Sequence, residues 1–285
     1  MGYAAVPAST GTLCKYAAML ARTHKFSSIK QYLNVVGILH RQWDLANPLQ
    51  DNFHLGCTLR GIHRQLGSKV SRKAPISPEL LLDVLGSLNM SNPTECNIWA
   101  AALTMFFGML RKSNVLSSSP NTFDPSRHLR RKDIQFHQNG MTITIRWSKT
   151  IQFKDRLHII PLPRTPSSLL CPTLATFHAF SLTNAAHPEG PAFVAMHSNN
   201  ITPLTVSDFM HTINKVLLNK GYDVSAFGTH SFRRGGATLA FHSGVPVETI
   251  KHIGDWKSLA YTKYIVPTDE SLQKATQAMV SNIRL

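Results

Sequence analysis

Apolar side chains recur at helical spacing along the first part of the chain. The stretches Leu13–Leu20, Ile29–Leu39 and Leu55–Leu66 each repeat apolar residues three or four positions apart, with polar residues between them. This pattern predicts three amphipathic helices that each bury one face. We expect them to form a small helical domain.

The pattern then breaks. The segment Gly67–Pro78 mixes Gly, Ser, Pro and like charges, which favours an extended, solvated connection over packed structure. We therefore expect two domains, residues 1–73 and residues 74–285.

A change of period from 3.6 to 2 marks a small sheet in the second domain. Apolar residues alternate with polar ones over Met141–Trp147, and Asn139-Gly140 just before them is a strong hairpin turn. The expected partner strands are Lys132–Phe136 and Arg156–Leu162. The strands are few and neighbouring, so the sheet should be antiparallel.

Helical signals surround this sheet. Ser77-Pro78 and Asn92-Pro93 each combine an N-cap residue with Pro at the first helical position. The second of these helices should end at Leu110. Later helices are expected at Pro172–Leu182, Thr205–Asn219, Phe232–His242 and Val247–Ile253, the second of them opened by a Thr205/Asp208 capping box. The fold class is thus mainly α with a small antiparallel β-sheet, a helical domain followed by an α+β domain.

The charge of the chain points to a polyanion. Its 285 residues contain 30 Lys and Arg against 15 Asp and Glu, a net charge of +15. Residues 1–73 carry +8 of this and the remainder +7, so both domains are basic. Nucleic acid is the simplest partner for such a protein, although a basic charge can also serve solubility alone.

Cysteine spacing and hydropathy exclude several other classes. Cys14, Cys57, Cys96 and Cys171 form no C-x-x-C pair, which indicates reduced thiols rather than a disulfide scaffold or a zinc ribbon. The longest apolar stretch, Ile98–Leu110, is shorter than the ~20 residues that a membrane span needs. No signal peptide is recognisable, so we expect a soluble intracellular protein without a membrane partner.

A metal or cofactor is not expected. The pairs His54 with Cys57 and His242 with His252 lack the further ligands of a metal site, and no carboxylate cluster has metal-ligand spacing.

The candidate chemistry lies in an ordered series of residues. His230 and Arg233 are three positions apart at a helix start, so their side chains can converge on one face. Alone this pair is a weak signal, because His128 and Arg131 repeat the spacing. The rest of the series is Arg111 upstream, Lys149 between two strands, then Trp256 and Tyr264 downstream.

This order of residue types resembles the tyrosine recombinases and integrases. The resemblance covers Ile76–Pro267, and the first domain resembles the core-binding, SAM-like domain of that family. The phrases LRKSN, GDWKS and YTKYI are most similar to recombinases of eukaryotic mobile elements of the DIRS and Crypton types. The family implies a nuclear protein if the origin is eukaryotic, and otherwise a nucleoid or cytoplasmic one.

The resemblance implies a role for each residue. Tyr264 would attack a DNA phosphodiester and form a 3′-phosphotyrosine link. Arg111 and Arg233 would bind the non-bridging oxygens, where negative charge accumulates in the transition state. An ordinary helix-terminal cation is the alternative for Arg111.

The other residues would move protons or pack. Lys149 is implied as the general acid to the leaving 5′-oxygen, with Lys154 as its alternative. His230 would take the proton of the nucleophile or bind the phosphate. Trp256 would donate its indole N–H or pack against the tyrosine, for which Tyr261 is the alternative nucleophile.

The chain departs from the family pattern in three places. Many members carry an acidic residue three positions after the first Arg, where this chain has Asn114. The tyrosine follows Trp256 by eight positions, one fewer than is usual. The first domain has three expected helices where four are usual, so the chain is expected to be shortened there.

The sequence therefore predicts a metal-independent, site-specific recombinase or integrase that acts on double-stranded DNA. The alternatives are an inactive DNA-binding protein derived from a mobile element and a type IB topoisomerase-like enzyme. Helical spacing in Ser271–Leu285 favours docking of this tail on a neighbouring protomer, and the family implies a homotetramer on DNA.

Overall fold

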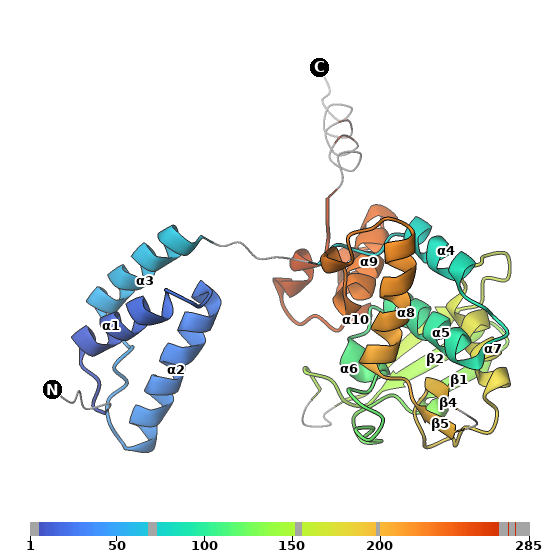
Figure 1. Cartoon of the computed structure of the whole chain (residues 1–285), viewed down its shortest axis with the longest axis horizontal. Coiled ribbons are helices and arrows are strands. Elements are labelled where there is room, and N and C mark those ends of the chain that lie inside the picture. The colour runs from blue at the N-terminus through green and yellow to red at the C-terminus, as the bar shows by residue number, and fades with distance from the viewer. Residues whose placement is uncertain are drawn as a thin grey trace. The chain divides into compact units, whose positions relative to one another are not determined.

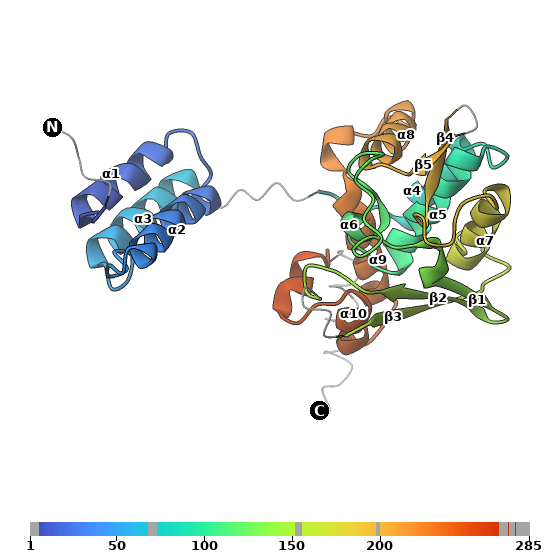
Figure 2. The same ribbon diagram turned by 90° about the horizontal axis from the view of Figure 1, so that it is seen from below.

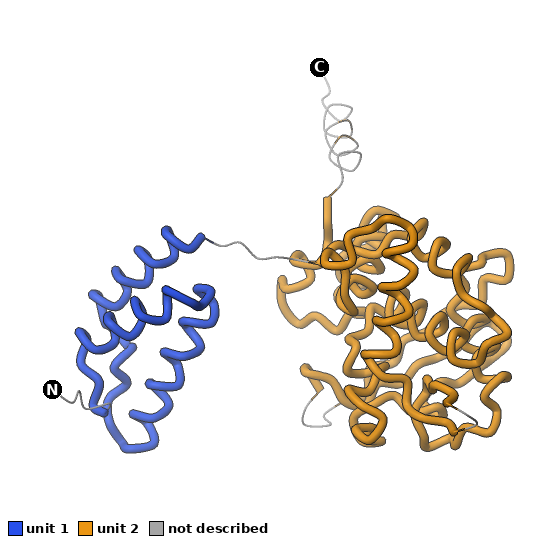
Figure 3. The backbone as a smooth tube through the Cα atoms, in the orientation of Figure 1, with its two compact units in different colours: residues 1–71 blue, residues 72–285 orange. Residues whose placement is uncertain are grey.

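The chain forms two compact units. A computed structural model describes residues 6–67, 73–151, 156–197 and 200–267, together with residues 273 and 277. The units divide between Ser71 and Arg72 (Figure 3).

Three helices make up the first unit, α1 (Thr10–Leu20), α2 (Phe26–Gln42) and α3 (Phe53–Leu66) (Figure 1). Their buried apolar faces meet in one core, which contains Leu13, Ile29 and Leu55. The predicted helices are confirmed, but all three begin two or three residues earlier. In α1 the reason is the Ser9 hydroxyl, which accepts from the Thr12 amide and caps the first turn.

A central helix organises the second unit. In α5 (Pro93–Phe107) every residue from Cys96 to Phe106 is buried, as in a helix that is surrounded by protein. It packs against α7 (Pro172–Leu182), α9 (Thr229–His242) and β4 (Val194–His197). It ends before the predicted Leu110, because the chain turns at Gly108 and takes a positive φ of 46° at Met109.

A three-stranded antiparallel sheet lies beside these helices (Figure 2), in the order β1 (Ile134–His137), β2 (Gly140–Ile145), β3 (His158–Pro163). The alternation predicted for the middle strand is confirmed, since Met141 and its next-but-one neighbours face the core. Gly140 has a φ of 156°, and a Cβ there would lie 2.3 Å from the Leu162 carbonyl oxygen. The hairpin turn therefore requires glycine.

The remaining elements complete the second unit. They are α4 (Pro78–Ser87), α6 (Lys112–Val115), β5 (Asn200–Pro203), α8 (Val206–Asn219), α10 (Val247–Ile253), and the 3₁₀ segments η1 (Arg131–Asp133), η2 (Val224–Ala226) and η3 (Leu259–Lys263). The Ser77 N-cap and the Thr205/Asp208 capping box are confirmed. The β4–β5 hairpin was not predicted. None of the described helices has the length and apolar character of a membrane span.

The predicted fold class, mainly α with a small antiparallel sheet, is confirmed. The prediction of a solvated connection is wrong for residues 73–77. The Ala74 amide donates to the Ala226 carbonyl at 2.7 Å, the Ile76 amide donates to that of Ser231 at 3.0 Å, and Ile76 is buried. An apolar side chain and paired amides hold this segment on the second unit; residues 68–72 lie outside the described part of the chain.

Close packing behind α9 generates a stability prediction. A Cβ on Gly235 would lie 2.0 Å from the Ile76 carbonyl oxygen, whereas a Cβ on Gly86 in α4 would meet nothing within 4 Å. We expect Gly235→Ala to lower the free energy of unfolding by about 1–3 kcal/mol. Gly86→Ala should leave it unchanged or raise it by up to about 1 kcal/mol, because alanine favours the helix. Urea unfolding of both variants checks this, and equal stabilities would contradict the close packing.

Candidate active site

One pocket in the second unit brings together residues that are distant in the sequence. Its volume is about 560 Å³. Five of the six candidate residues line it: Arg111, Lys149, His230, Trp256 and Tyr264. The sixth, Arg233, is buried against the rings of Trp256 and Tyr264.

Arg111 enters the pocket because the chain turns sharply after α5. Two residues past the turn at Met109, Arg111 occupies the N-cap position of α6 in extended conformation, and its side chain is half-buried. Lys112 lines the pocket next to it. An arginine in a pocket wall can offer paired N–H donors to an oxyanion.

Lys149 reaches the pocket from the turn between β2 and β3. Ser148 and Ile151 form an isolated antiparallel bridge, so Lys149 and Thr150 are at the tip of a tight turn. The Lys149 side chain is exposed. The alternative residue, Lys154, lies outside the described residues.

Helix α9 carries His230 and Arg233 in its first two turns. It begins at Thr229, three residues before the predicted start, so both residues are helical and share a face. Desolvation in the pocket wall and the charges of Arg233, Lys112 and Arg111 lower the pKa of His230. The imidazole is thereby kept neutral near pH 7 and is able to accept a proton.

Arg233 is a buried cation with main-chain partners. It is 2% exposed, and its two terminal nitrogens donate to the carbonyls of Met109 and Gly254. Burial and the charge of Arg111 lower its pKa, and Tyr264 and Asp255 partly offset this effect. Its Nε has no hydrogen-bond partner among the described residues. Arg233 and Arg111 also line a second, narrow cavity together.

Two aromatic rings that line the pocket pack against Arg233, which does not line it itself. Its guanidinium carbon lies 4.1 Å from the Trp256 ring centre and 5.2 Å from that of Tyr264. The two rings are 5.0 Å apart and tilted by 52°. A cation at this distance is attracted to the ring faces and favours negative charge on the phenol oxygen.

The backbone of Tyr264 is fixed to α9. Its carbonyl accepts from the Thr238 hydroxyl at 3.1 Å, and its amide donates to the Tyr261 carbonyl at 2.8 Å. Tyr261 packs in the small apolar cluster around Trp256 and does not line the pocket. Of these two tyrosines, Tyr264 is therefore the one that lines the pocket.

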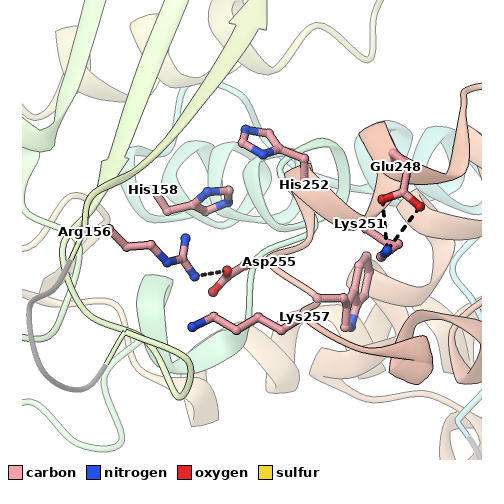
Figure 4. Close-up of a pocket in the computed structure, with 8 residues that line it drawn as sticks. Arg156, His158, Glu248, Lys251, His252, Asp255 and Lys257 are labelled. Carbon is pink, nitrogen blue, oxygen red and sulfur yellow. Dashed lines mark hydrogen bonds and ion pairs between the residues drawn. The ribbon is translucent and has the colours of Figure 1, made fainter.

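Sequence reasoning missed several residues of this site. The further lining residues are Lys112, Ser113, Thr150, Asp255, Lys257, Ser258 and Ala260. Lys112 and Lys257 adjoin candidate residues in the sequence, which is the only signal that could have pointed to them. Asp255 also borders a neighbouring pocket of about 300 Å³, where it pairs with Arg156 (Figure 4).

The second H-x-x-R pair is structural. Arg131 donates to the Phe180 carbonyl at 2.6 Å and stacks on the Phe180 ring, while His128 accepts from the Asp124 amide at 2.9 Å. Within the described ranges, no group of three or more His, Cys, Asp or Glu side chains is arranged to hold a metal ion.

The chain resembles known integrases and recombinases in sequence and in fold. No family model matches the chain. An integrase/recombinase XerD homologue from Selenomonas ruminantium is 25% identical over 258 residues, which cover 87% of this chain and 70% of the relative.

Solved structures share the fold at low identity. A Tn1549 transposon integrase in complex with circular intermediate DNA has a TM-score of 0.56 and 14% identity, covering 96% of this chain and 86% of that one. XerH recombinase bound to a palindromic difH substrate has a TM-score of 0.61 and 15% identity, and the match covers 96% of this chain and 73% of that one. A lambda integrase dimer bound to a COC′ core site has a TM-score of 0.61 and 13% identity, and the match covers 93% of this chain and 82% of that one.

The chain thus has the fold of DNA integrases and recombinases, and its second unit gathers cationic and aromatic residues around one tyrosine. In sequence the chain is similar to a XerD-type integrase/recombinase, and in fold to DNA integrases and recombinases. The finer resemblance to DIRS and Crypton elements, and the nuclear location that it implies, stay predictions.

The lowered pKa of His230 can be tested directly. We expect its NMR titration midpoint to lie below the usual value of about 6.5, and to rise in Lys112→Ala, because that variant removes one of the neighbouring cations. Lys220→Ala, which removes a lysine paired with Asp83 instead, is the control and should leave the midpoint unchanged. A His230 midpoint at or above 6.5 in the unaltered protein would contradict this electrostatic interpretation.

Proposed function

We propose that this protein is a site-specific DNA recombinase or integrase that cleaves and rejoins DNA through a 3′-phosphotyrosine intermediate. The observation that carries this proposal is the single pocket that joins Arg111, Lys149, His230, Trp256 and Tyr264, with Arg233 behind the tyrosine ring. These residues come from four separate stretches of the chain.

The substrate we propose is double-stranded DNA. The net charge of +15 is shared by both units, and Lys112 and Lys257 add cations around the candidate residues. Phosphate contacts of this kind give affinity without sequence preference and weaken as salt rises. In this proposal residues 1–73 act as the family's core-binding domain and residues 74–285 as its catalytic domain.

The cleavage step needs proton transfers at both ends of the reacting phosphate. The Tyr264 oxygen attacks phosphorus while its proton passes to the neutral imidazole of His230. The bond from phosphorus to the 5′-oxygen breaks, and that oxygen takes a proton from the Lys149 ammonium. Rejoining reverses each transfer, so the step needs no external energy source.

Cationic side chains stabilise the charge that develops in this step. Arg111 binds the non-bridging oxygens from the pocket wall, and Arg233 adds its positive field from behind the Tyr264 ring. Trp256 packs against both the Arg233 guanidinium and the Tyr264 ring and holds that ring in place. The charge compensation comes from the chain itself, so we expect the step to proceed in the presence of a chelator.

Covalent capture tests the proposal. A pool of nicked duplexes with randomised sequence around the nick should yield a protein–DNA adduct on a denaturing gel, in buffer with chelator. Tyr264→Phe should abolish the adduct because it removes the attacking oxygen. Tyr261→Phe is the matched control and should retain it.

Other outcomes select the alternatives. DNA binding without any adduct would identify an inactive DNA-binding protein. Relaxation of supercoiled DNA by a monomer, without joining of two duplexes, would favour a type IB topoisomerase-like enzyme. An adduct lost in Tyr261→Phe and kept in Tyr264→Phe would overturn the choice of nucleophile.

We further propose that four protomers assemble on two duplexes through the tail Ser271–Leu285. Apart from residues 273 and 277, this tail lies outside the described residues, and the proposal rests on its helical apolar spacing and on the family resemblance. Deletion of residues 271–285 should reduce the tetramer on DNA to smaller species in sizing experiments with light scattering. An undiminished tetramer would exclude docking through the tail.

A further inference from the structure

Asp255 occupies a constrained position between Gly254 and the candidate residue Trp256. Its φ is 54°, in the left-handed region that residues with a side chain rarely adopt. Before it, a Cβ on Gly254 would lie 1.9 Å from the Trp256 ring. After it, Trp256 covers Arg233. The chain accepts a strained conformation here and buries the carboxylate of Asp255 at 9% exposure.

The carboxylate holds both sides of the turn that carries Lys149. One oxygen accepts from the Ser148 hydroxyl at 3.2 Å and from the Thr150 hydroxyl, and the other accepts from Arg156. The two hydroxyls are themselves 2.9 Å apart. Ser148 and Thr150 are the immediate neighbours of Lys149, so the contacts fix the backbone on either side of it. Figure 4 shows the Arg156 side of this cluster.

Charge keeps this carboxylate ionised. Burial by itself raises the pKa of Asp255, but hydrogen bonds from Thr150 and Arg156, with the charges of Arg156 and His158, outweigh burial and lower it. An ionised acceptor makes stronger hydrogen bonds than a neutral one.

Asn114 holds the same turn from the other end. Its Nδ2 donates to the Trp147 carbonyl at 2.8 Å, and the side chain is buried. This is the position where the family resemblance led us to expect an acidic residue, three places after Arg111. An amide can donate to a carbonyl and a carboxylate cannot. The carboxylate in this region comes instead from Asp255, which lines the same narrow cavity as Asn114 and Ser148.

We propose that Asp255 is a positioning residue for Lys149, whose carboxylate fixes the turn 148–151 so that the lysine ammonium meets the leaving 5′-oxygen. This inference rests on the proposed function. A flexible lysine side chain on an exposed turn samples many positions, and a small displacement of a reacting group can lower a rate by about 100-fold. The carboxylate itself does not touch the reacting atoms.

The test compares two leaving groups. The cleavage position mapped on the randomised pool is synthesised with oxygen or with sulfur as the bridging 5′ atom. Sulfur leaves without being protonated, because a thiol is far more acidic than an alcohol, so it makes a general acid unnecessary. We expect Asp255→Asn to slow adduct formation about 10- to 100-fold with the oxygen substrate and less than about 3-fold with the sulfur substrate. Thr150→Val, which removes the hydroxyl that donates to Asp255 and keeps the charge of the carboxylate, should show a smaller effect of the same kind.

Asp133→Asn is the matched control. Asp133 is another buried carboxylate with two arginine partners, Arg130 and Arg146, and it does not line the pocket. Its variant measures the general effect of losing such a group and should slow both substrates equally, if at all. Melting temperatures of all variants establish that each is folded in the assay.

Three results overturn the inference. One is equal slowing of both substrates by Asp255→Asn, another is a rate like that of the unaltered protein, and the third is loss of folding in Asp255→Asn with an unaffected Thr150→Val. Failure of the proposed function is distinguishable from all of these, because then the unaltered protein forms no adduct that depends on Tyr264.

Discussion

Burial of one guanidinium group connects the separate parts of the site. Arg233 on α9 donates to the main-chain carbonyl of Met109, after α5, and to that of Gly254, after α10. A buried charge that loses its polar partners costs several kcal/mol, so these segments are held together wherever the second unit is folded. The pocket around Tyr264 is therefore a consequence of core packing and not of surface loops alone.

The same burial sets the electrostatics of the pocket. Arg233 and Arg111 repel each other, and burial disfavours the charge of Arg233, which is why its pKa falls. Tyr264 and Asp255 offset part of this cost. An anionic phosphate would offset more of the cost of burying the Arg233 charge. The charged site should therefore be more stable with the proposed DNA substrate bound than without it. Such sites trade stability for function.

Local patterns predicted most of the elements, and their failures have local causes. The hairpin before β2 followed from Asn139-Gly140 and the alternation after it, and the helices followed from periodicity and caps. The β4–β5 hairpin was not predicted because its strands are only four residues each and the first of them, VAMH, lacks the alternation that marks β2. The segment 73–77 was predicted to be a solvated linker because the residues around it are mostly Gly, Ser and Lys. Its one large apolar side chain, Ile76, is buried only by tertiary packing.

The sequence by itself determined the order and the types of the candidate reactive residues, the basic charge, and the helices and strands that carry them, because capping and periodicity act over a few residues. Only the tertiary structure decided that Tyr264 shares a pocket with Lys149, that Arg233 lies behind it, and that Asp255 holds the turn of the lysine. Ser148 and Asp255 are 107 positions apart, and Arg233 and Met109 are 124 apart. Contacts over such separations depend on how the whole unit packs, and no local pattern encodes them.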